Sequence, residues 1–144
     1  VLASPEQLAR VHAEMVAGDS TTRVESVDAA QRTIAAEWPQ VPALPDVPEE
    51  HVMACCMKPI KNKKTACVLL NSGDVPVTMM VADGKDVRMP KSRTLVSGGV
   101  TYHVSAAGSI NMLMTERDGR WMCLMGALPE TELIQLASKF PLKQ

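Results

Sequence analysis

The chain from Val52 to Met125 alternates between short apolar runs and turn residues. The turns carry Gly, Asn or Asp, as in Asn71-Ser72-Gly73-Asp74 and Asp118-Gly119. Short runs with turn signals roughly every 8 to 12 residues are typical of an antiparallel sheet built from sequential hairpins. We therefore expect a meander of about six strands, at 52–57, 64–70, 75–81, 100–104, 110–115 and 120–125, with weaker strands at 87–89 and 94–96.

Helical periodicity marks both ends of the chain. Ser4-Pro5-Glu6-Gln7 has the pattern of a capping box, and apolar residues follow at helical spacing until Gly18. A second helix is predicted from Asp28 to the residue before Pro39, and Pro129 is predicted to begin a last helix that packs on the sheet. The three apolar stripes are Leu8, Val11, Met15 and Val16; Ala30, Ile34 and Trp38; and Leu133, Leu136, Ala137 and Phe140.

Four prolines recur at every third position between the helices and the strands: Pro39, Pro42, Pro45 and Pro48. This period matches a polyproline II helix, and the apolar residues between the prolines favour a connector packed along the domain over a ligand for a proline-recognition domain. The chain thus divides into an N-terminal helical segment (1–38), a Pro-rich strap (39–51) and an antiparallel sheet with a C-terminal helix (52–144). Together they predict a single compact domain of the α+β class.

Charge and motif content exclude several classes of function. The 144 residues include 15 Lys and Arg against 16 Asp and Glu, and a net charge of −1 argues against direct binding to nucleic acid. The sequence contains no phosphate-binding loop, no nucleophile elbow and no clustered histidines, so we predict no catalytic residues and no enzyme activity. No apolar run reaches the roughly 18 to 20 residues of a membrane-spanning helix. The start at Val1 rather than Met predicts trimming or processing, with an upstream anchor as one explanation.

Sulfur is over-represented in the composition. The chain has ten Met and four Cys, against two Trp, one Tyr and one Phe. A structural zinc site requires Cys pairs two to four residues apart. Cys55 and Cys56 are adjacent and would point to opposite faces of a strand, and Lys58 stands where an H-x-x-x-C-x-x-C motif needs its second cysteine. We therefore predict no zinc site and no cofactor.

A two-residue turn at Asp118-Gly119 would bring four sulfur side chains to one face of a hairpin: Met112, Met114, Cys123 and Met125. Thioether and thiolate ligands favour Cu(I), so these four residues are a candidate soft-metal site. The alternative, which we favour, is that they form the core of a sheet with few aromatic residues. A Met-lined wall for an apolar ligand is a further interpretation.

A turn around Lys61-Asn62 would set Cys56 opposite Cys67 in a second hairpin. In an oxidising compartment this pair would be placed for a cross-strand disulfide. The redox state of Cys55, Cys56, Cys67 and Cys123 stays open at this point.

The order of elements from about Pro45 to Phe140 carries a family resemblance. A proline-containing strap precedes a strand pair and the strand Val75-Pro76-Val77-Thr78-Met79-Met80-Val81. A late hairpin follows with Asp118-Gly119-Arg120-Trp121, and Gly126-Ala127-Leu128-Pro129 then leads into a helix that contains Glu132-Leu133. In these features the chain resembles the extracytoplasmic domain of bacterial membrane-anchored anti-sigma factors and related transmembrane transcriptional regulators.

The resemblance implies a sensory or protein-interaction domain on the outer side of the bacterial cytoplasmic membrane, held there by an upstream anchor. Its expected partner is a protein or a protease, and homodimerisation is one way in which it could act. Such a domain would modulate the release of a sigma factor without contacting sigma factor or DNA. Sheet positions that are aromatic in many such proteins are Met here, so no binding residues are transferred from the family.

Overall fold

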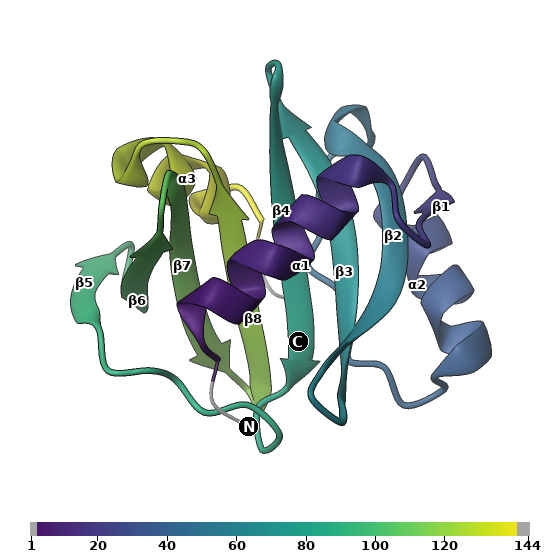
Figure 1. Cartoon of the computed structure of the whole chain (residues 1–144), viewed down its shortest axis with the longest axis horizontal. Helices are drawn as coiled ribbons and strands as arrows, with labels where there is room; N and C mark the ends of the chain where they lie inside the picture. The colour runs from purple at the N-terminus through teal and green to yellow at the C-terminus, as the bar shows by residue number, and fades with distance from the viewer. Residues whose placement is uncertain (1–2, 141–144) are drawn as a thin grey trace.

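The computed structural model describes residues 3–140, in which helices cover both faces of one eight-stranded antiparallel sheet (Figure 1). Val1 and the last four residues of the segment predicted at 52–144 lie outside the described residues. The helices are α1 (Pro5–Ala17), α2 (Val27–Glu37) and α3 (Glu130–Ser138), with a short 3₁₀ helix at Glu49–His51. The strands are β1 (Thr22–Arg23), β2 (Val52–Ile60), β3 (Lys63–Ser72), β4 (Val75–Asp83), β5 (Arg93–Ser97), β6 (Val100–Ala107), β7 (Ile110–Arg117) and β8 (Arg120–Gly126).

The α+β class and the C-terminal helix on the sheet are confirmed, whereas the strand count and the simple meander need correction. The strand order is β1-β2-β3-β4-β8-β7-β6-β5, so two four-stranded meanders meet where β4 pairs with β8. After β4 the chain crosses to the far edge of the sheet and returns inward strand by strand. Hairpin patterns report only pairings between sequence neighbours, and for this reason the central pairing was missed. The expected strand 87–89 is reduced to a contact in which the Ala3 N–H donates to the Arg88 carbonyl (2.9 Å).

Both predicted hairpin turns are confirmed. Asp118 (φ 53°) and Gly119 (φ 77°) have the left-handed conformation that a type I′ turn requires. Met114 therefore lies opposite Cys123, in the predicted register. In the hairpin of β2 and β3, the strands extend beyond their predicted ends at residues 57 and 64 to a two-residue turn at Lys61-Asn62, and Cys56 lies opposite Cys67.

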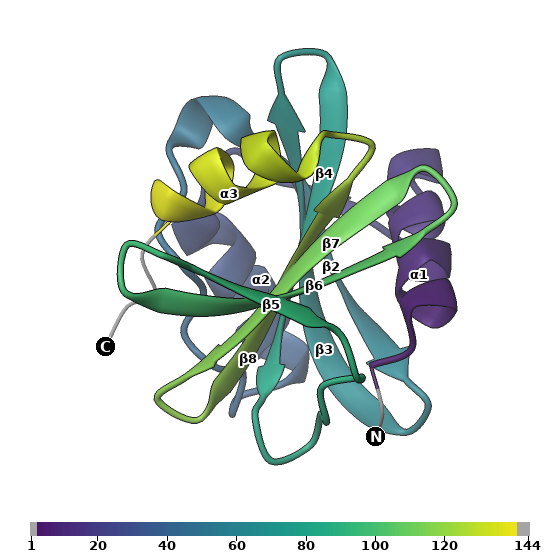
Figure 2. The ribbon, with the colours of Figure 1, turned by 90° about the vertical axis from the view of Figure 1, so that its left-hand side faces the viewer.

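The two faces of the sheet carry separate hydrophobic clusters. Seen along the sheet in Figure 2, α1 lies on one side and α2 and α3 lie on the other. We call the side under α1 the sulfur face, because about half of the buried residues in its cluster are Met or Cys. We call the side under α2 and α3 the aliphatic face, where Val and Leu predominate. Coverage on both sides explains why β8 is buried along its whole length.

Helix α1 differs from its predicted pattern in two details. The capping box does not form, since Ser4 Oγ donates to Glu6 Oε2 (3.1 Å) and caps no backbone group. Val16 was assigned to the apolar stripe but is 49% exposed. His12 is buried in its place, with Nδ1 2.7 Å from Thr78 Oγ1 on β4. The helix ends at Gly18, whose φ of 80° favours glycine.

Helix α2 begins at Val27, one residue before the predicted start. Ser26 caps it, because its side chain accepts a hydrogen bond from the Ala29 N–H (3.0 Å). Ala30, Ile34 and Trp38 are buried as the stripe predicted.

The strap between α2 and the sheet is held by side chains from both: Arg120 on β8 donates to the Ala43 carbonyl (3.2 Å), and Gln31 on α2 makes two hydrogen bonds. The Gln31 side-chain amide donates to the Pro42 carbonyl (3.2 Å), and its oxygen accepts from the Leu44 N–H (2.8 Å). Leu44 and Val47 are buried in the aliphatic face. The strap therefore packs along the sheet, as its interleaved apolar residues indicate. Among residues 3–140, no helix is long and apolar enough to cross a membrane.

Candidate functional site

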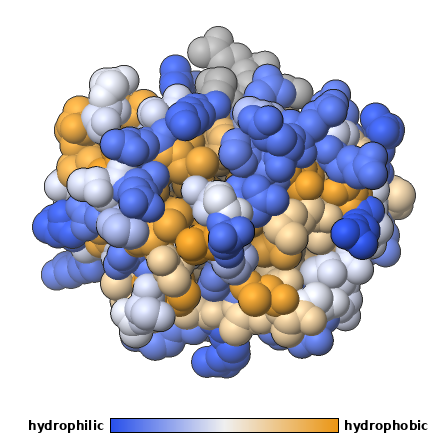
Figure 3. All heavy atoms as spheres, turned by 90° about the horizontal axis from the view of Figure 1, so that it is seen from above, coloured by the Kyte–Doolittle hydropathy of each residue, from blue (hydrophilic) through white to orange (hydrophobic). Residues whose placement is uncertain are grey.

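Large apolar side chains are scarce on the described surface. Those exposed are Val16, Met53 and Val96. On the side of the molecule seen from above in Figure 3, apolar patches are broken up by hydrophilic side chains. A concave site is therefore a better candidate than a flat apolar surface.

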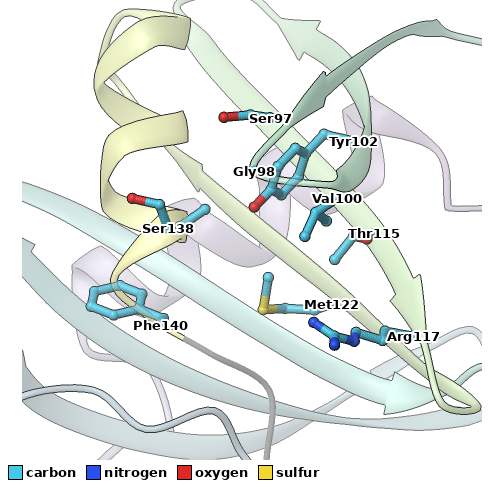
Figure 4. Close-up of a pocket in the computed structure, with 10 residues that line it drawn as sticks. Ser97, Gly98, Val100, Tyr102, Thr115, Arg117, Met122, Ser138 and Phe140 are labelled. Carbon is cyan, nitrogen blue, oxygen red and sulfur yellow. The ribbon is translucent and has the colours of Figure 1, made fainter.

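One pocket lies between α3 and the strands β6, β7 and β8, on the aliphatic face (Figure 4). Its volume is about 220 Å³, which is smaller than the roughly 300 to 1,000 Å³ of pockets for drug-sized ligands, so the pocket suits only a compact molecule. Its lining residues come from four strands (β5 to β8), the β5–β6 turn, α3 and the residue Phe140 that follows α3: Ser97, Gly98, Val100, Tyr102, Thr115, Arg117, Met122, Ala137, Ser138 and Phe140. A more open hollow of about 380 Å³ shares Gly98, Val100, Thr115 and Arg117 with it.

The lining of this pocket combines an apolar floor with polar groups. Val100, Met122 and Phe140 supply the apolar part, and Figure 4 shows the Tyr102 ring and the Arg117 side chain on different sides of the same space. Burial raises the pKa of the Tyr102 phenol, so it remains a neutral hydroxyl at physiological pH. Arg117 is the one charged residue in the lining, and its side chain is half exposed. The pocket can therefore accept an apolar body with an acidic group directed at Arg117.

The two walls of the pocket belong to elements far apart in the sequence. Hairpin β5–β6 forms one wall and α3 the other. Outside the pocket, the guanidinium of Arg93 on β5 donates to both carboxylate oxygens of Glu130 on α3, with Nη1 and Oε1 2.9 Å apart. The Arg93 guanidinium lowers the pKa of Glu130. Since this ion pair is exposed to solvent, it contributes little to holding the walls together.

The four residues of the predicted soft-metal site are brought together on the sulfur face. Met112 lies opposite Met125, Met114 lies opposite Cys123, and all four are fully buried. They belong to the cluster under α1, which agrees with the favoured interpretation as core. Burial raises the pKa of the Cys123 thiol, so this group keeps its proton.

The register extends this arrangement into a row of sulfur side chains across five neighbouring strands. We call it the sulfur row: Cys56 (β2), Cys67 (β3), Met80 (β4), Cys123 (β8) and Met114 (β7). Each member lies opposite the next, and all are buried. The two hairpin patterns predict two pairs of the row, Cys56 with Cys67 and Met114 with Cys123. Met80 lies opposite Cys123 only because β4 pairs with β8, and the sequence patterns do not reveal that pairing.

Three sulfur atoms meet at the β2 end of this row. The Cys56 thiol donates to Met15 Sδ, at a distance of 3.1 Å. Hydrogen bonding from Cys67 and the nearby Lys58 ammonium lower the pKa of Cys56, while the same bond and burial raise the pKa of Cys67. Both cysteines are free thiols in the structure. Cys55 points to the opposite face, where burial raises its pKa to about 11.

Within residues 3–140, no group of three or more His, Cys, Asp or Glu side chains is placed to hold a metal ion. Comparison of the chain with family models, curated proteins and solved structures gives no match. The pocket and the sulfur row are therefore the two features from which a function can be inferred.

Several pocket residues had no signal in the sequence patterns. Ser97-Gly98-Gly99 reads as a turn, and the structure shows that its two glycines connect β5 to β6 beside the pocket. Tyr102 is the single Tyr of the chain, which is the one compositional hint that it has a special place. Arg117 reads as a turn-flanking residue of the hairpin. The convergence of these residues with Ser138 requires α3 to be placed over the sheet, which no local pattern specifies.

Proposed function

We propose that this chain is a non-enzymatic sensory domain that binds a small organic acid in the pocket between α3 and hairpin β5–β6. Its place is the outer side of a bacterial cytoplasmic membrane, in a regulator of the kind that the anti-sigma-factor resemblance implies. The observation that carries the proposal is the pocket itself. It combines an apolar floor, a neutral Tyr102 hydroxyl and the cationic Arg117 in a space of about 220 Å³.

The position of the pocket supports a sensory role. A ligand that contacts Val100 on β6 and Ala137 on α3 would connect hairpin β5–β6 to α3, which outside the pocket share the exposed Arg93–Glu130 ion pair. Binding would therefore stabilise the docked position of α3. A change in α3 docking is a signal that a protein partner or a protease can read, and it requires no chemical reaction in this domain. The net charge of −1 agrees with a role that involves no direct contact with nucleic acid.

A pair of valines in one hairpin offers a matched test of the pocket. Val100→Trp would fill the pocket, whereas Val96→Trp changes a residue that is 70% exposed on the neighbouring strand. Wild type and both variants would be titrated with a panel of small carboxylic acids with apolar bodies, with calorimetry as the readout. We expect binding by wild type and Val96→Trp and loss of binding in Val100→Trp. No binding by any acid in the panel, or equal binding by the two variants, would contradict the proposal.

The role of the acidic group is tested at Arg117. Arg117→Gln should weaken binding of the acid but not of its neutral amide analogue, while Arg10→Gln, at an exposed position on α1, should change neither. Hydrogen exchange with and without the acid should show added protection in α3 and in hairpin β5–β6. Protection elsewhere with none at α3 would argue against signalling through this helix.

The regulatory context is tested by the gene that encodes the chain. An adjacent gene for an extracytoplasmic sigma factor would support the proposal. A full-length protein without a membrane-spanning segment would contradict the proposed location and leave the pocket to be tested separately.

A further inference from the structure

At the β2 end of the sulfur row, three sulfur side chains lie close together, which packing of a Met- and Cys-rich core does not by itself require. Cys56 and Cys67 face each other across neighbouring strands, and Met15 approaches from α1 to 3.1 Å between Sδ and Cys56 Sγ. The three residues come from three different elements and are buried. The Cys56 sulfur thus has a thioether and a second thiol as direct neighbours, separate from the pocket on the other face.

We propose that Cys56, Cys67 and Met15 form a three-coordinate binding site for Cu(I). Metal–thiolate bonds are about 2.3 Å long, so the ligand sulfurs around a three-coordinate ion lie about 4 Å apart. Met15 Sδ therefore has to move away from Cys56 by about 1 Å. Methionine has three rotatable side-chain bonds and accommodates such a shift easily.

The ligand set selects the metal. Soft thiolate and thioether ligands favour Cu(I), whereas zinc takes four ligands from Cys, His and carboxylates. Among the described residues, no three side chains of His, Cys, Asp or Glu come together as a zinc site would need. The third sulfur here belongs to a methionine, which is a ligand for Cu(I) and a poor one for zinc.

Binding at this site is an exchange of protons for metal without a change in oxidation state. Cu(I) forms bonds to both cysteine sulfurs, each thiol releases its proton to solvent, and Met15 donates a lone pair. The product carries one net negative charge, from two thiolates and one Cu⁺. The nearby Lys58 ammonium compensates that charge. Lys58 is held beside the site, because its Nζ donates to the Asp19 carbonyl (3.1 Å) and lies 3.7 Å from Glu14 Oε1.

The opposite end of the sulfur row lacks these properties. Around Met112, Met114 and Met125, the one thiol among the described residues is Cys123, so this end of the row supplies one thiolate where the β2 end supplies two. The hairpin pattern predicted a soft-metal site on β7 and β8, and the site that we propose lies instead at the other end of the row, on β2 and β3. The shift could not be foreseen from sequence spacing, because Met15 joins the site only through the packing of α1 on the sheet.

Bound Cu(I) would connect α1 to hairpin β2–β3. A ligand that binds only the folded chain raises its stability. Bound Cu(I) should therefore raise the thermal unfolding midpoint of the chain, whereas an ion bound loosely at the surface would leave it nearly unchanged.

The test uses the whole reduced chain without oxygen and a chromophoric Cu(I) chelator as competitor, so that transfer of Cu(I) to the protein is read from absorbance. We expect one Cu(I) per chain. Cys56→Ser and Cys67→Ser should each weaken binding by more than the roughly 10- to 100-fold that outer-sphere partners of a metal contribute. Met15→Leu keeps the side-chain volume, so it provides a folded variant in which affinity should also fall.

Matched controls are available within the same sheet. Cys55→Ser removes the neighbouring thiol, which points to the opposite face, and should leave the affinity unchanged. Cys123→Ser and Met114→Leu change the other end of the row and should also leave it unchanged. X-ray absorption of the copper-loaded protein should show sulfur ligands only. Absence of Cu(I) transfer to wild type, equal affinity in Cys56→Ser, or loss of affinity in Cys123→Ser would each overturn the proposal, and none of these outcomes affects the pocket.

Discussion

The two faces of this sheet solve the same packing problem with different side chains. Under α2 and α3, branched aliphatic residues from the strands meet Trp38, Tyr102 and Phe140, and the pocket opens between α3 and the strands. Under α1, one helix covers a surface rich in Met and Cys, with Trp121 as its one large aromatic residue. Thioether side chains adapt their shape to gaps, whereas Val and Leu have few rotamers. We therefore expect side-chain positions to be fixed more strictly on the aliphatic face, and the sulfur face to tolerate substitution better.

The largest effect is expected from a cavity on the aliphatic face. Leu124 lies in the central strand β8 and is fully buried. Leu124→Ala should lower the free energy of unfolding by about 3 kcal/mol, because it removes apolar contacts and leaves a cavity in closely packed surroundings. Urea denaturation measures the change, with Leu124→Met as the volume-conserving control. A loss below about 1 kcal/mol would show that this face also relaxes around a cavity.

A second effect is expected where the strap is held over the aliphatic face. Gln31→Ala removes the two hydrogen bonds that the Gln31 side chain makes to the strap and leaves the Leu44 N–H without its acceptor. We expect a loss of about 1 to 2 kcal/mol in the free energy of unfolding. Arg32→Ala, at an exposed position on the same helix, is the control. Faster proteolysis of the strap in Gln31→Ala alone would support the interpretation, and equal rates in both variants would speak against it.

The sulfur face should show its own dependence on pH through His12. Burial lowers the pKa of His12 in the folded protein, whereas the unfolded chain has an ordinary histidine pKa of about 6.5. As the pH falls through about 6.5, the unfolded state takes up the proton first, so the stability of the folded state decreases. Urea denaturation at pH 7.5, 6.5 and 5.5 measures this decrease, which should be smaller in His12→Gln. A steeper loss in the variant would contradict the assignment.

The smallest effect is expected from exchanging one methionine on the sulfur face. Met112→Leu conserves volume in a fully buried position, and it should change the free energy of unfolding by less than about 1.5 kcal/mol. The matched exchange on the aliphatic face is Met79→Leu, also fully buried. If Met112→Leu destabilises the chain more than Met79→Leu, the sulfur face tolerates substitution less well than the aliphatic face, and the comparison is wrong.

Local patterns predicted the local parts of the fold. Asp118-Gly119 fixed the register of a hairpin, because only a few residue pairs favour a type I′ turn. Pro5 and Gly18 placed the ends of α1 for similarly local reasons. The pairing of β4 with β8 and the two-residue strand β1 had no such signal, since both depend on segments distant in sequence. They escaped prediction for that physical reason.

The candidate sites divide in the same way. Cys56 opposite Cys67 and Met114 opposite Cys123 follow from hairpin turns and were predicted. The third sulfur of the proposed copper site comes from α1, and its contact depends on helix packing. The hydrogen bond of His12 to Thr78 likewise depends on the packing of α1 on the sheet. His12 is buried under α1, whereas Val16, which the apolar stripe assigned to the core, is exposed.

The seam between β4 and β8 has a consequence for the order in which the chain folds. Every other strand pair within the two meanders, from β2 to β4 and from β5 to β8, joins neighbours through a short turn or connection. The seam instead closes a loop that contains the whole of β5, β6 and β7, and long loops carry a larger entropic cost of closure. We expect the two meanders to form early and the seam to close last, so the rate of folding should depend on the contact order of this single strand pair.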